Sequence, residues 1–449
     1  MRSNRVLAAA ALSLAALAAA CGNPGSSGDD KAATTAAPAK KVDIAKAGNV
    51  TLTVWDQEVR GGQNAQMKEL NSQFQAKYPN VKIKRVAKSF EDLNTTLKLA
   101  VSGTKAPDVV EANQGRPVMG QLVKARLLRP LDQYAKQYGW EQRYAPVLLD
   151  LNRFGPGAKA FGSGNLYGLS QMGEIVGVFY NKAKVTTPPK TFDEFQAQLA
   201  QAKKAGDVPI QFGNLDKWPG IHEFETIQGQ LASKDAIRNF VFAKPGGSFD
   251  TPENQQATQT IQQWAKSGYF TPNFNGTGYD PAWQRFTKGK GRFLIAGTWL
   301  VADLAKRMGD KVGFMLMPAR DAGADPVSLG GESLPFTITS KSKHPDVAAA
   351  YIDFITNANA QQVLTETDNL PAMKVGSAQP SEPLAQDVAT AWRTLSEKDG
   401  LVPYLDYATP EFYDQITAAI QEMLAGKDNP QGFTKKVQGD YAKFADTVT

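Results

Sequence analysis

Histidine and cysteine are scarce in this chain: among 449 residues, only two are His and one is Cys. A single cysteine excludes an intrachain disulfide. His222-Glu223 lacks a second His four residues later, so the zinc-protease pattern is absent, and no Gly-x-Ser-x-Gly nucleophile motif occurs. These absences argue against a metalloenzyme or a serine hydrolase, and no cofactor is expected. A glycoside hydrolase needs only two carboxylates and stays open as an alternative.

Long hydrophobic runs are also missing after residue 20, so no later segment is expected to span a membrane. Residues 1–20 carry Arg2, Arg5 and an Ala/Leu run too short for a span, which predicts a secretory signal peptide. Cys21 follows small residues and resembles a bacterial lipobox, although Ala18 stands where Leu is usual. We expect Cys21 to be lipidated, which would anchor an exported protein to the outer face of the cell membrane. Ordinary cleavage with an incidental cysteine is the alternative.

A concentrated charge excess is absent too. The formal net charge is +6, of which Arg2 and Arg5 contribute two, and the densest basic run, at residues 288–292, has no interleaved aromatics. Nucleic acid is therefore not an expected partner. Residues 21–47 contain almost no large apolar side chain and predict a flexible tether. The remaining part is long enough for two lobes, and a monomer is expected.

The first half of this part alternates between strand and helix patterns. Strands are predicted near residues 50–55, 81–86 and 107–111, and helices at 66–78 and 90–101. This order predicts an α/β fold with a parallel sheet. Because ligands bind beyond the carboxyl ends of such strands, the polar residues after the first and third strands are candidate ligand contacts: Gln57, Glu58, Arg60, Asn113, Gln114 and Arg116.

A second group of strands surrounds residues 166–182, where a Tyr-Gly turn leads into an apolar run that contains Glu174. Burying a lone carboxylate in a strand is costly without a partner. Glu174 either lies at an exposed strand end or faces a ligand. Further strands are predicted at 208–212, 291–299, 311–318 and 330–338, and helices at 192–205, 345–363 and from 380 onward, which gives two sheets. The Gly-rich residues 155–164 lack the flanking strand and helix of a phosphate cradle and predict a surface loop.

Taken in order, these motifs resemble the bacterial extracellular solute-binding proteins of family 1, the maltose-binding-protein-like lipoprotein receptors of ABC sugar importers. The resemblance covers nearly all of the globular part. It rests on the segments Leu52–Trp55, Tyr78–Ile83, Pro107–Val110, Leu166–Leu169, Val178–Lys182, Pro189–Glu194, Gly297–Trp299, Gly330–Gly331 and Met423–Lys427.

The resemblance implies a two-lobed periplasmic-binding-protein-like (type II) fold with the ligand cleft between the lobes. The N-terminal lobe would comprise residues 48–168 and about 312–370, and the C-terminal lobe about 169–311 and 371–449. The chain would cross between them at 167–171, 301–312 and 365–374, and ligand would close the lobes by hinge bending. The implied partners are permease subunits of an ABC transporter.

The resemblance also assigns cleft residues. Glu174 matches the crossover carboxylate and Trp299 the stacking tryptophan, while Trp218, Glu332, Tyr404 and Asp406 fall in loops that face the cleft, and Trp283 is a further candidate. Sugar sites combine hydrogen-bonding side chains with flat aromatic rings, and these candidates have that composition. The alternatives are core positions for the tryptophans, surface roles for Arg60 and Arg116, and a polyamine, an osmolyte or a metal chelate as the ligand.

Overall fold

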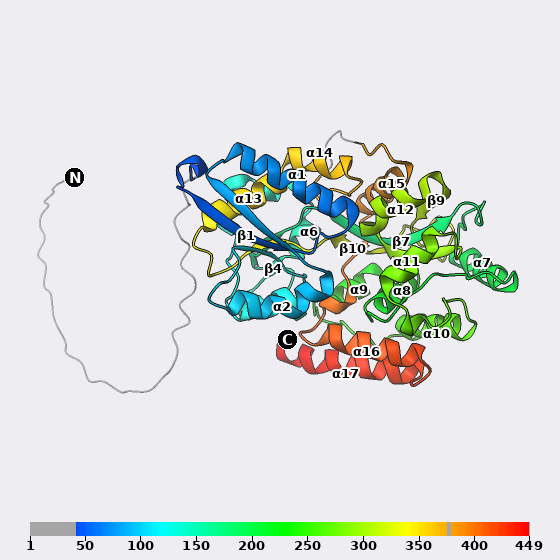
Figure 1. Cartoon of the computed structure of the whole chain (residues 1–449). Coiled ribbons are helices and arrows are strands. Elements are labelled where there is room, and N and C mark those ends of the chain that lie inside the picture. Colours follow the sequence, from blue (N-terminus) through cyan, green and yellow to red (C-terminus); the bar gives the residue numbers. More distant parts are fainter. Residues whose placement is uncertain (1–41, 375–378, 449) are drawn as a thin grey trace, which may run out of the picture. The chain divides into compact units, whose positions relative to one another are not determined.

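The computed structural model describes residues 42–374 and 379–448 (Figure 1). The predicted signal peptide, Cys21 and the tether up to residue 41 lie outside the described residues. The tether was predicted to reach residue 47, but the side chain of Ile44 is buried and its carbonyl accepts a hydrogen bond from Asn80 Nδ2 (2.8 Å). The fold therefore begins a few residues earlier than predicted, because one apolar side chain suffices to hold this end against the core.

The first sheet has the strand order β2-β1-β3-β11-β6. As predicted, β1 (Val50–Asp56) is parallel to both β2 (Val81–Ala87) and β3 (Val109–Glu111). Two strands from later in the chain extend this sheet. β11 (Phe336–Ile338) is antiparallel to β3, and β6 (Gly168–Leu169) is antiparallel to β11. The parallel register brings the carboxyl ends of β1 and β3 to one edge of the sheet, together with the polar loops that follow them.

The helices α1 (Gly61–Lys77) and α2 (Phe90–Ser102) connect these parallel strands. α2 begins where predicted, because the Ser89 side chain caps it by accepting the Asp92 N–H (3.1 Å). α1 begins five residues before the predicted start. A Cβ on Gly62 would come within 2.5 Å of the Thr367 carbonyl and 2.7 Å of the Ala302 side chain. The helix therefore starts with glycines, because the segments of the same chain that contain Ala302 and Thr367 leave no room for a side chain at position 62.

The second sheet has the order β12-β10-β7-β8, and β9 also pairs with β7. Its central strand β7 (Gly173–Asn181) is antiparallel to β8 (Phe293–Gly297), β9 (Val312–Met315) and β10 (Ser328–Glu332). β12 (Leu401–Val402) lies parallel to β10. The stretch around Glu174 therefore forms the central strand of a second sheet, and the predicted two-sheet α/β fold is confirmed.

One passage between the sheets lies elsewhere than predicted. β9 and β10 both belong to the second sheet, and β11 belongs to the first. The chain therefore returns to the first sheet at residues 333–335 rather than near residues 301–312. The apolar residues of β9 would suit either sheet, so their pattern could not identify the pairing partner. The earlier passage, between β6 and β7, overlaps the predicted residues 167–171. The wider division into lobes stays a prediction.

Helices cover both sheets (Figure 1). Two predicted elements differ from the structure. The predicted helix at 345–363 is two helices, because Asn357 caps the second one by accepting the Ala360 N–H. The predicted strand at 208–212 is reduced to isolated bridges made by Ile210.

No helix among residues 42–374 and 379–448 is long and apolar enough to cross a membrane. The remaining elements are α3 (Gln121–Lys124), α4 (Asp132–Tyr138), α5 (Trp140–Arg143), α6 (Pro146–Asp150), β4 (Arg153–Phe154), β5 (Asn165–Leu166), α7 (Phe192–Lys204), α8 (Pro219–Gln228), α9 (Lys234–Val241), α10 (Pro252–Lys266), α11 (Tyr279–Thr287), α12 (Val301–Met308), α13 (Pro345–Ile355), α14 (Ala358–Glu366), α15 (Pro383–Glu397), α16 (Phe412–Leu424) and α17 (Pro430–Val448).

Candidate ligand-binding cleft

A cavity of about 100 Å³ lies where the loops after β1 and β3 face the start of β7, the start of α8 and the short helix η7 (Leu405–Tyr407). We call it the cleft cavity. The structure brings many of the sequence-predicted residues together on its wall, although their role as ligand contacts stays a prediction. These residues are Gln57, Arg60, Asn113, Glu174, Trp218, Trp299, Tyr404 and Asp406.

Glu174 is held at the start of β7 by close packing of that strand against β10. Gly330 and Gly331 adopt φ angles of 135° and 144°, and a Cβ on Gly330 would come within 2.2 Å of the Glu174 carbonyl. The Glu174 carboxylate accepts a hydrogen bond from the Tyr404 hydroxyl (2.9 Å). Burial, with the negative charges of Glu58 and Asp406, raises the pKa of Glu174 to about 8, while the Tyr404 hydrogen bond lowers it. Burial therefore disfavours the negative charge of Glu174 unless a cation lies beside it.

Two tryptophans form an aromatic wall of the cleft cavity. Trp299 follows β8, and its ring folds back over Gly297, where any Cβ would overlap the indole. Trp299 Nε1 donates to the Tyr279 hydroxyl (2.7 Å), and the Trp218 ring lies 6.1 Å from the Trp299 ring. Trp218 Nε1 donates to Glu91 Oε1 (3.1 Å). Hydrogen bonds thus fix the rings and leave part of their faces toward the cavity, as stacking on a flat ligand requires.

The opposite wall comes from the loops after β1 and β3 and presents amides and one guanidinium. Arg60 Nη1 forms an ion pair with Asp280 Oδ1 of α11 (2.9 Å), and its guanidinium lies 5.6 Å from the Tyr279 ring centre. Gln57 Nε2 lies 3.3 Å from Glu58 Oε1. The Arg60–Asp280 pair connects the loop after β1 to α11.

Several cavity residues were missed by sequence reasoning: Gln63, Phe90, Ile221, His222, Leu334, Tyr407 and Tyr413. His222 is the most informative. It was considered only as part of a metal motif, yet its ring lies 5.3 Å from that of Tyr404 and 5.7 Å from that of Trp299. Burial lowers its pKa to about 3, so the imidazole is neutral. Its spacing of four residues from Trp218, on the same helical face, was the signal that could have found it.

Two predicted carboxylates do not line the cavity. Glu58 is fully buried beneath the loop after β1, where burial raises its pKa to about 7 and its closest acidic neighbour is Glu111. Glu332 is also buried and accepts a hydrogen bond from Asn152 Nδ2. Burial raises the pKa of Glu332 to about 8. Both side chains are buried and point toward hydrogen-bond partners or a second acid, so neither lines the cleft cavity.

Three more predicted residues also lie away from the cavity. Gln114 Nε2 donates to the Ser333 carbonyl (2.8 Å). Arg116 is buried, and its Nη1 donates to the carbonyls of Val241 (2.8 Å) and Ala408 (2.7 Å). Trp283 packs in the core and donates to Asp280 Oδ1 (2.8 Å). These side chains bond to backbone or core partners, and none of the three lines the cleft cavity.

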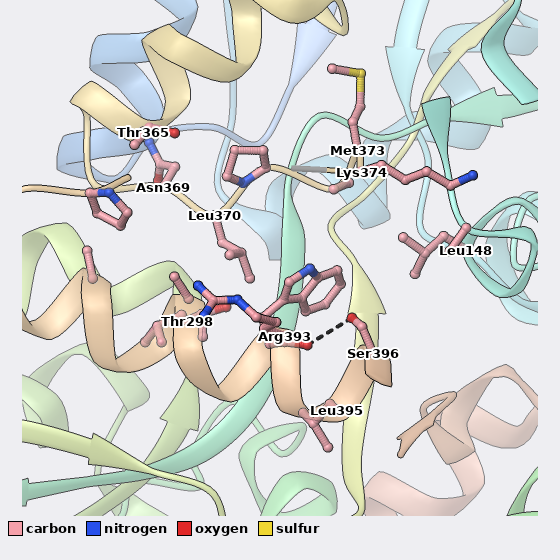
Figure 2. A pocket seen from close by; sticks show the side chains of 18 of the residues that line it. Leu148, Thr298, Thr365, Asn369, Leu370, Met373, Lys374, Arg393, Leu395 and Ser396 are labelled. Atoms are coloured by element: carbon pink, nitrogen blue, oxygen red, sulfur yellow. Dashed lines mark hydrogen bonds between the residues drawn. The ribbon is translucent and has the colours of Figure 1, made fainter. Parts of the chain in front are cut away.

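A larger cavity, of about 730 Å³, lies between α15 and residues 368–374, which follow α14 (Figure 2). Figure 2 shows Leu148, Leu370 and Leu395 around it, and the Ser396 hydroxyl donates to the Trp392 carbonyl (2.8 Å). A larger share of its lining is apolar than in the cleft cavity, so sugar hydroxyls would find fewer partners there. Size alone therefore does not make it the candidate site. Within the described ranges, no group of three or more His, Cys, Asp or Glu side chains could hold a metal ion.

Comparisons with known proteins give the same fold and a family. An uncharacterized ABC transporter extracellular-binding protein of Pyrococcus horikoshii is 24% identical over 385 residues, covering 82% of each chain. The multiple sugar-binding protein of Streptococcus mutans is 22% identical over 75% of this chain and 78% of that protein. The solved structure of a chitin oligosaccharide binding protein superposes with a TM-score of 0.76, at 22% identity, over 89% of this chain and 99% of that one. Residues 69–391 match the family described as bacterial extracellular solute-binding protein, so the chain belongs to this family.

Proposed function

We propose that this protein is the membrane-anchored receptor of an ABC importer and that it captures a carbohydrate, expected to be an oligosaccharide, for delivery to the permease. The observation that carries the proposal is the pairing of two walls in one cavity. Gln57 and Asn113 offer amides on one wall, while Trp218 and Trp299 offer aromatic rings beside Glu174 on the other. Sugars expose hydroxyls at their edges and C–H groups on their faces, which such walls complement.

The size of the cleft cavity supports a binding cycle with hinge motion. About 100 Å³ is less than the roughly 300–1,000 Å³ typical of small-molecule sites. An oligosaccharide therefore requires the two walls to separate, which breaks the Arg60–Asp280 pair (2.9 Å) and the Trp218–Glu91 hydrogen bond (3.1 Å). A ligand that touches both walls would favour the closed form by its differential affinity, and this closed form would signal occupancy to the permease.

The names of related proteins support the same ligand class. The relative from Streptococcus mutans is named a multiple sugar-binding protein, and the superposed structure is that of a chitin oligosaccharide binding protein. The role of Cys21 as the lipid anchor is part of the proposal. Substituting Cys21→Ala should move the protein from the membrane fraction to the soluble exported fraction, whereas unchanged membrane association would contradict the anchor.

A thermal-shift screen tests the ligand class. Purified protein is heated with mono- and oligosaccharides, polyamines and osmolytes over a range of concentrations. A ligand at about 100 times its Kd stabilises the folded state by about 2.7 kcal/mol. We expect a concentration-dependent rise in Tm with a sugar. Stabilisation by polyamines and by no sugar would refute the proposal, and turnover of a bound oligosaccharide would show that the protein is an enzyme instead.

A further inference from the structure

The charges on the wall of the cleft cavity do not balance. Its charged side chains are Arg60, Glu174 and Asp406. The Arg60 guanidinium is already committed to Asp280 (2.9 Å) and to the face of Tyr279. Two carboxyl groups therefore face the cavity, and among the described residues neither has an ion-pair partner.

Asp406 has fewer hydrogen-bond partners from other residues than Glu174. It is 9% exposed, and the single hydrogen bond to its carboxylate within the described part of the chain comes from its own backbone N–H. Glu174 has only the Tyr404 hydroxyl (2.9 Å). A carboxylate has about four acceptor positions, so most of those on Asp406 are open. Burial of such a group without partners is costly, and its position on the cavity wall indicates that a ligand supplies the missing donors.

Aromatic rings surround the two carboxyl groups. The Tyr404 hydroxyl donates to Glu174, and the Tyr404 ring lies 5.6 Å from that of Tyr407, the residue after Asp406. The two carboxyl groups are close enough for the charge of Asp406 to act on Glu174. Trp218 and Trp299 complete the wall. The faces of such rings attract cations as well as C–H groups. His222 adds no positive charge, because the buried imidazole is neutral. Carboxylates and ring faces together therefore suit a ligand that is partly cationic.

We propose that the ligand is an amino sugar whose ammonium group lies between Glu174 and Asp406. An ammonium offers three N–H donors, and its positive charge favours the ionised form of both carboxyl groups, which burial alone disfavours. A neutral sugar offers hydroxyl donors but no charge that stabilises the two carboxylates. This inference rests on the proposed function, because it keeps a sugar in the cleft and specifies one substituent of it.

Three disaccharides with one linkage test the inference by calorimetry: the β-1,4-linked dimers of glucosamine, glucose and N-acetylglucosamine. They differ at C2, where they carry an ammonium, a hydroxyl and a neutral amide. We expect the glucosamine dimer to bind at least tenfold more tightly than either neutral dimer. The corresponding monosaccharides, with galactosamine and galactose, are measured alongside so that a preference for another ring or length is still detected.

Two variants locate the charge effect. Asp406→Asn and Glu174→Gln keep the size of each side chain and remove its negative charge. Each should reduce the ratio of amino-sugar to neutral-sugar affinity at least threefold. The matched control is Asp414→Asn, which removes an exposed charge on α16 next to the cavity residue Tyr413 and should leave that ratio unchanged. If a variant fails to fold, the comparison of ligands on the unaltered protein still decides.

The outcomes separate this inference from the proposed function. Neutral sugars that bind as tightly as their amino counterparts would overturn the inference and leave the sugar receptor in place. Binding of no sugar in either series would overturn both. An amino-sugar preference that survives both carboxyl substitutions would refute the assigned position of the ammonium group.

Discussion

The two walls of the cleft cavity use charge in opposite ways. On the wall formed by the loops after β1 and β3, charged side chains mainly hold the loops. Arg85 forms a two-pronged pair with Asp56 (2.7 Å for each hydrogen bond) and also donates to the Glu58 carbonyl (2.6 Å). On the wall formed by β7, α8 and η7, Glu174 and Asp406 face the cavity. The first wall is therefore built for rigidity, and the second carries the groups with unused binding capacity.

The largest expected effect is on the stability of the first wall. Arg116→Ala removes a buried guanidinium that donates to the Val241 and Ala408 carbonyls and packs on Phe161 and Phe444 (5.4 and 4.7 Å). Leaving buried carbonyls unpaired costs about 1–3 kcal/mol each, so we expect a loss of roughly 3–5 kcal/mol in the free energy of unfolding. Urea denaturation measures it. A fold of unchanged stability that has lost ligand affinity would restore Arg116 as a ligand contact.

Substitutions on the second wall should lower the affinity for the sugar rather than the stability of the fold. Trp299→Ala removes the ring face that we expect to stack on the sugar. Central aromatic residues of binding sites contribute about 2 kcal/mol or more, so affinity should fall at least ~30-fold. Trp299→Phe keeps a ring and should recover part of the loss. Calorimetry with the tightest-binding sugar of the thermal-shift screen measures both, and equal affinities for the Ala and Phe variants would exclude stacking.

The buried carboxyls of both walls make stability depend on pH. Burial raises the pKa of Glu58 and Asp406 to about 7, and of Glu174 and Glu332 to about 8. Between their ordinary values and these values the folded protein holds protons that the unfolded chain releases. The contribution of these carboxyls to stability is therefore fully present below their ordinary pKa values and is lost as pH rises through the raised ones.

Urea denaturation between pH 6.5 and 8.5 checks this slope. His222 acts in the opposite direction, because burial lowers its pKa from 6.5 to about 3, but its contribution is complete above pH 6.5. Glu332→Gln keeps an acceptor for Asn152 and removes one titrating group. This variant should be less sensitive to pH than the unaltered protein. A slope unchanged by the substitution would mean that Glu332 is ionised in the folded state.

Substitutions of Glu174 and Glu332 compare a carboxyl group that lines the cavity with one that is buried away from it. Glu174→Ala removes the acceptor for the Tyr404 hydroxyl (2.9 Å) and one cavity carboxyl. We expect sugar affinity to fall roughly tenfold, about 1.4 kcal/mol, with little loss of stability. Glu332→Ala is the matched control, because Glu332 is buried off the cavity and supports Asn152. It should lower stability by about 1–3 kcal/mol and change affinity less. The reverse result would place Glu174 in the core.

Sequence patterns predicted which loops meet at the cleft, because parallel strands end at one edge of a sheet. They could not predict which residue of a loop faces inward. Gln57 lines the cavity while its neighbour Glu58 turns under the loop, and that choice depends on Asp56 Oδ1, which accepts the Glu58 N–H (3.1 Å). Arg85, which fixes Asp56, comes from the next strand. The orientation is thus set by a contact that no local pattern contains.

The second sheet shows the same limit at a larger scale. The apolar run of β7 and the Gly297-Thr298-Trp299 turn were readable, because a run of apolar residues and a tight turn are local properties. The pairing of β9 with β7 was not, since apolar strands suit more than one neighbour. His222 was missed for a related reason: its surroundings of Tyr404 and Trp299 come from distant segments. Local structure was therefore more predictable than the side chains that meet across the cleft.

The smallest expected effect concerns the contact between the walls. Asp280→Asn removes the ion pair with Arg60 but keeps an oxygen that can accept the Trp283 N–H. The Asp280 side chain is 54% exposed, and exposed pairs contribute about 0.2–1 kcal/mol. Sugar affinity should thus fall by less than about fivefold, and less at high salt than at low salt, because salt screens the pair. Asp310→Asn, an exposed change away from Arg60, is the control. A larger loss that persists at high salt would mean that Asp280 contacts the ligand, and the wall that carries the binding capacity would then extend to α11.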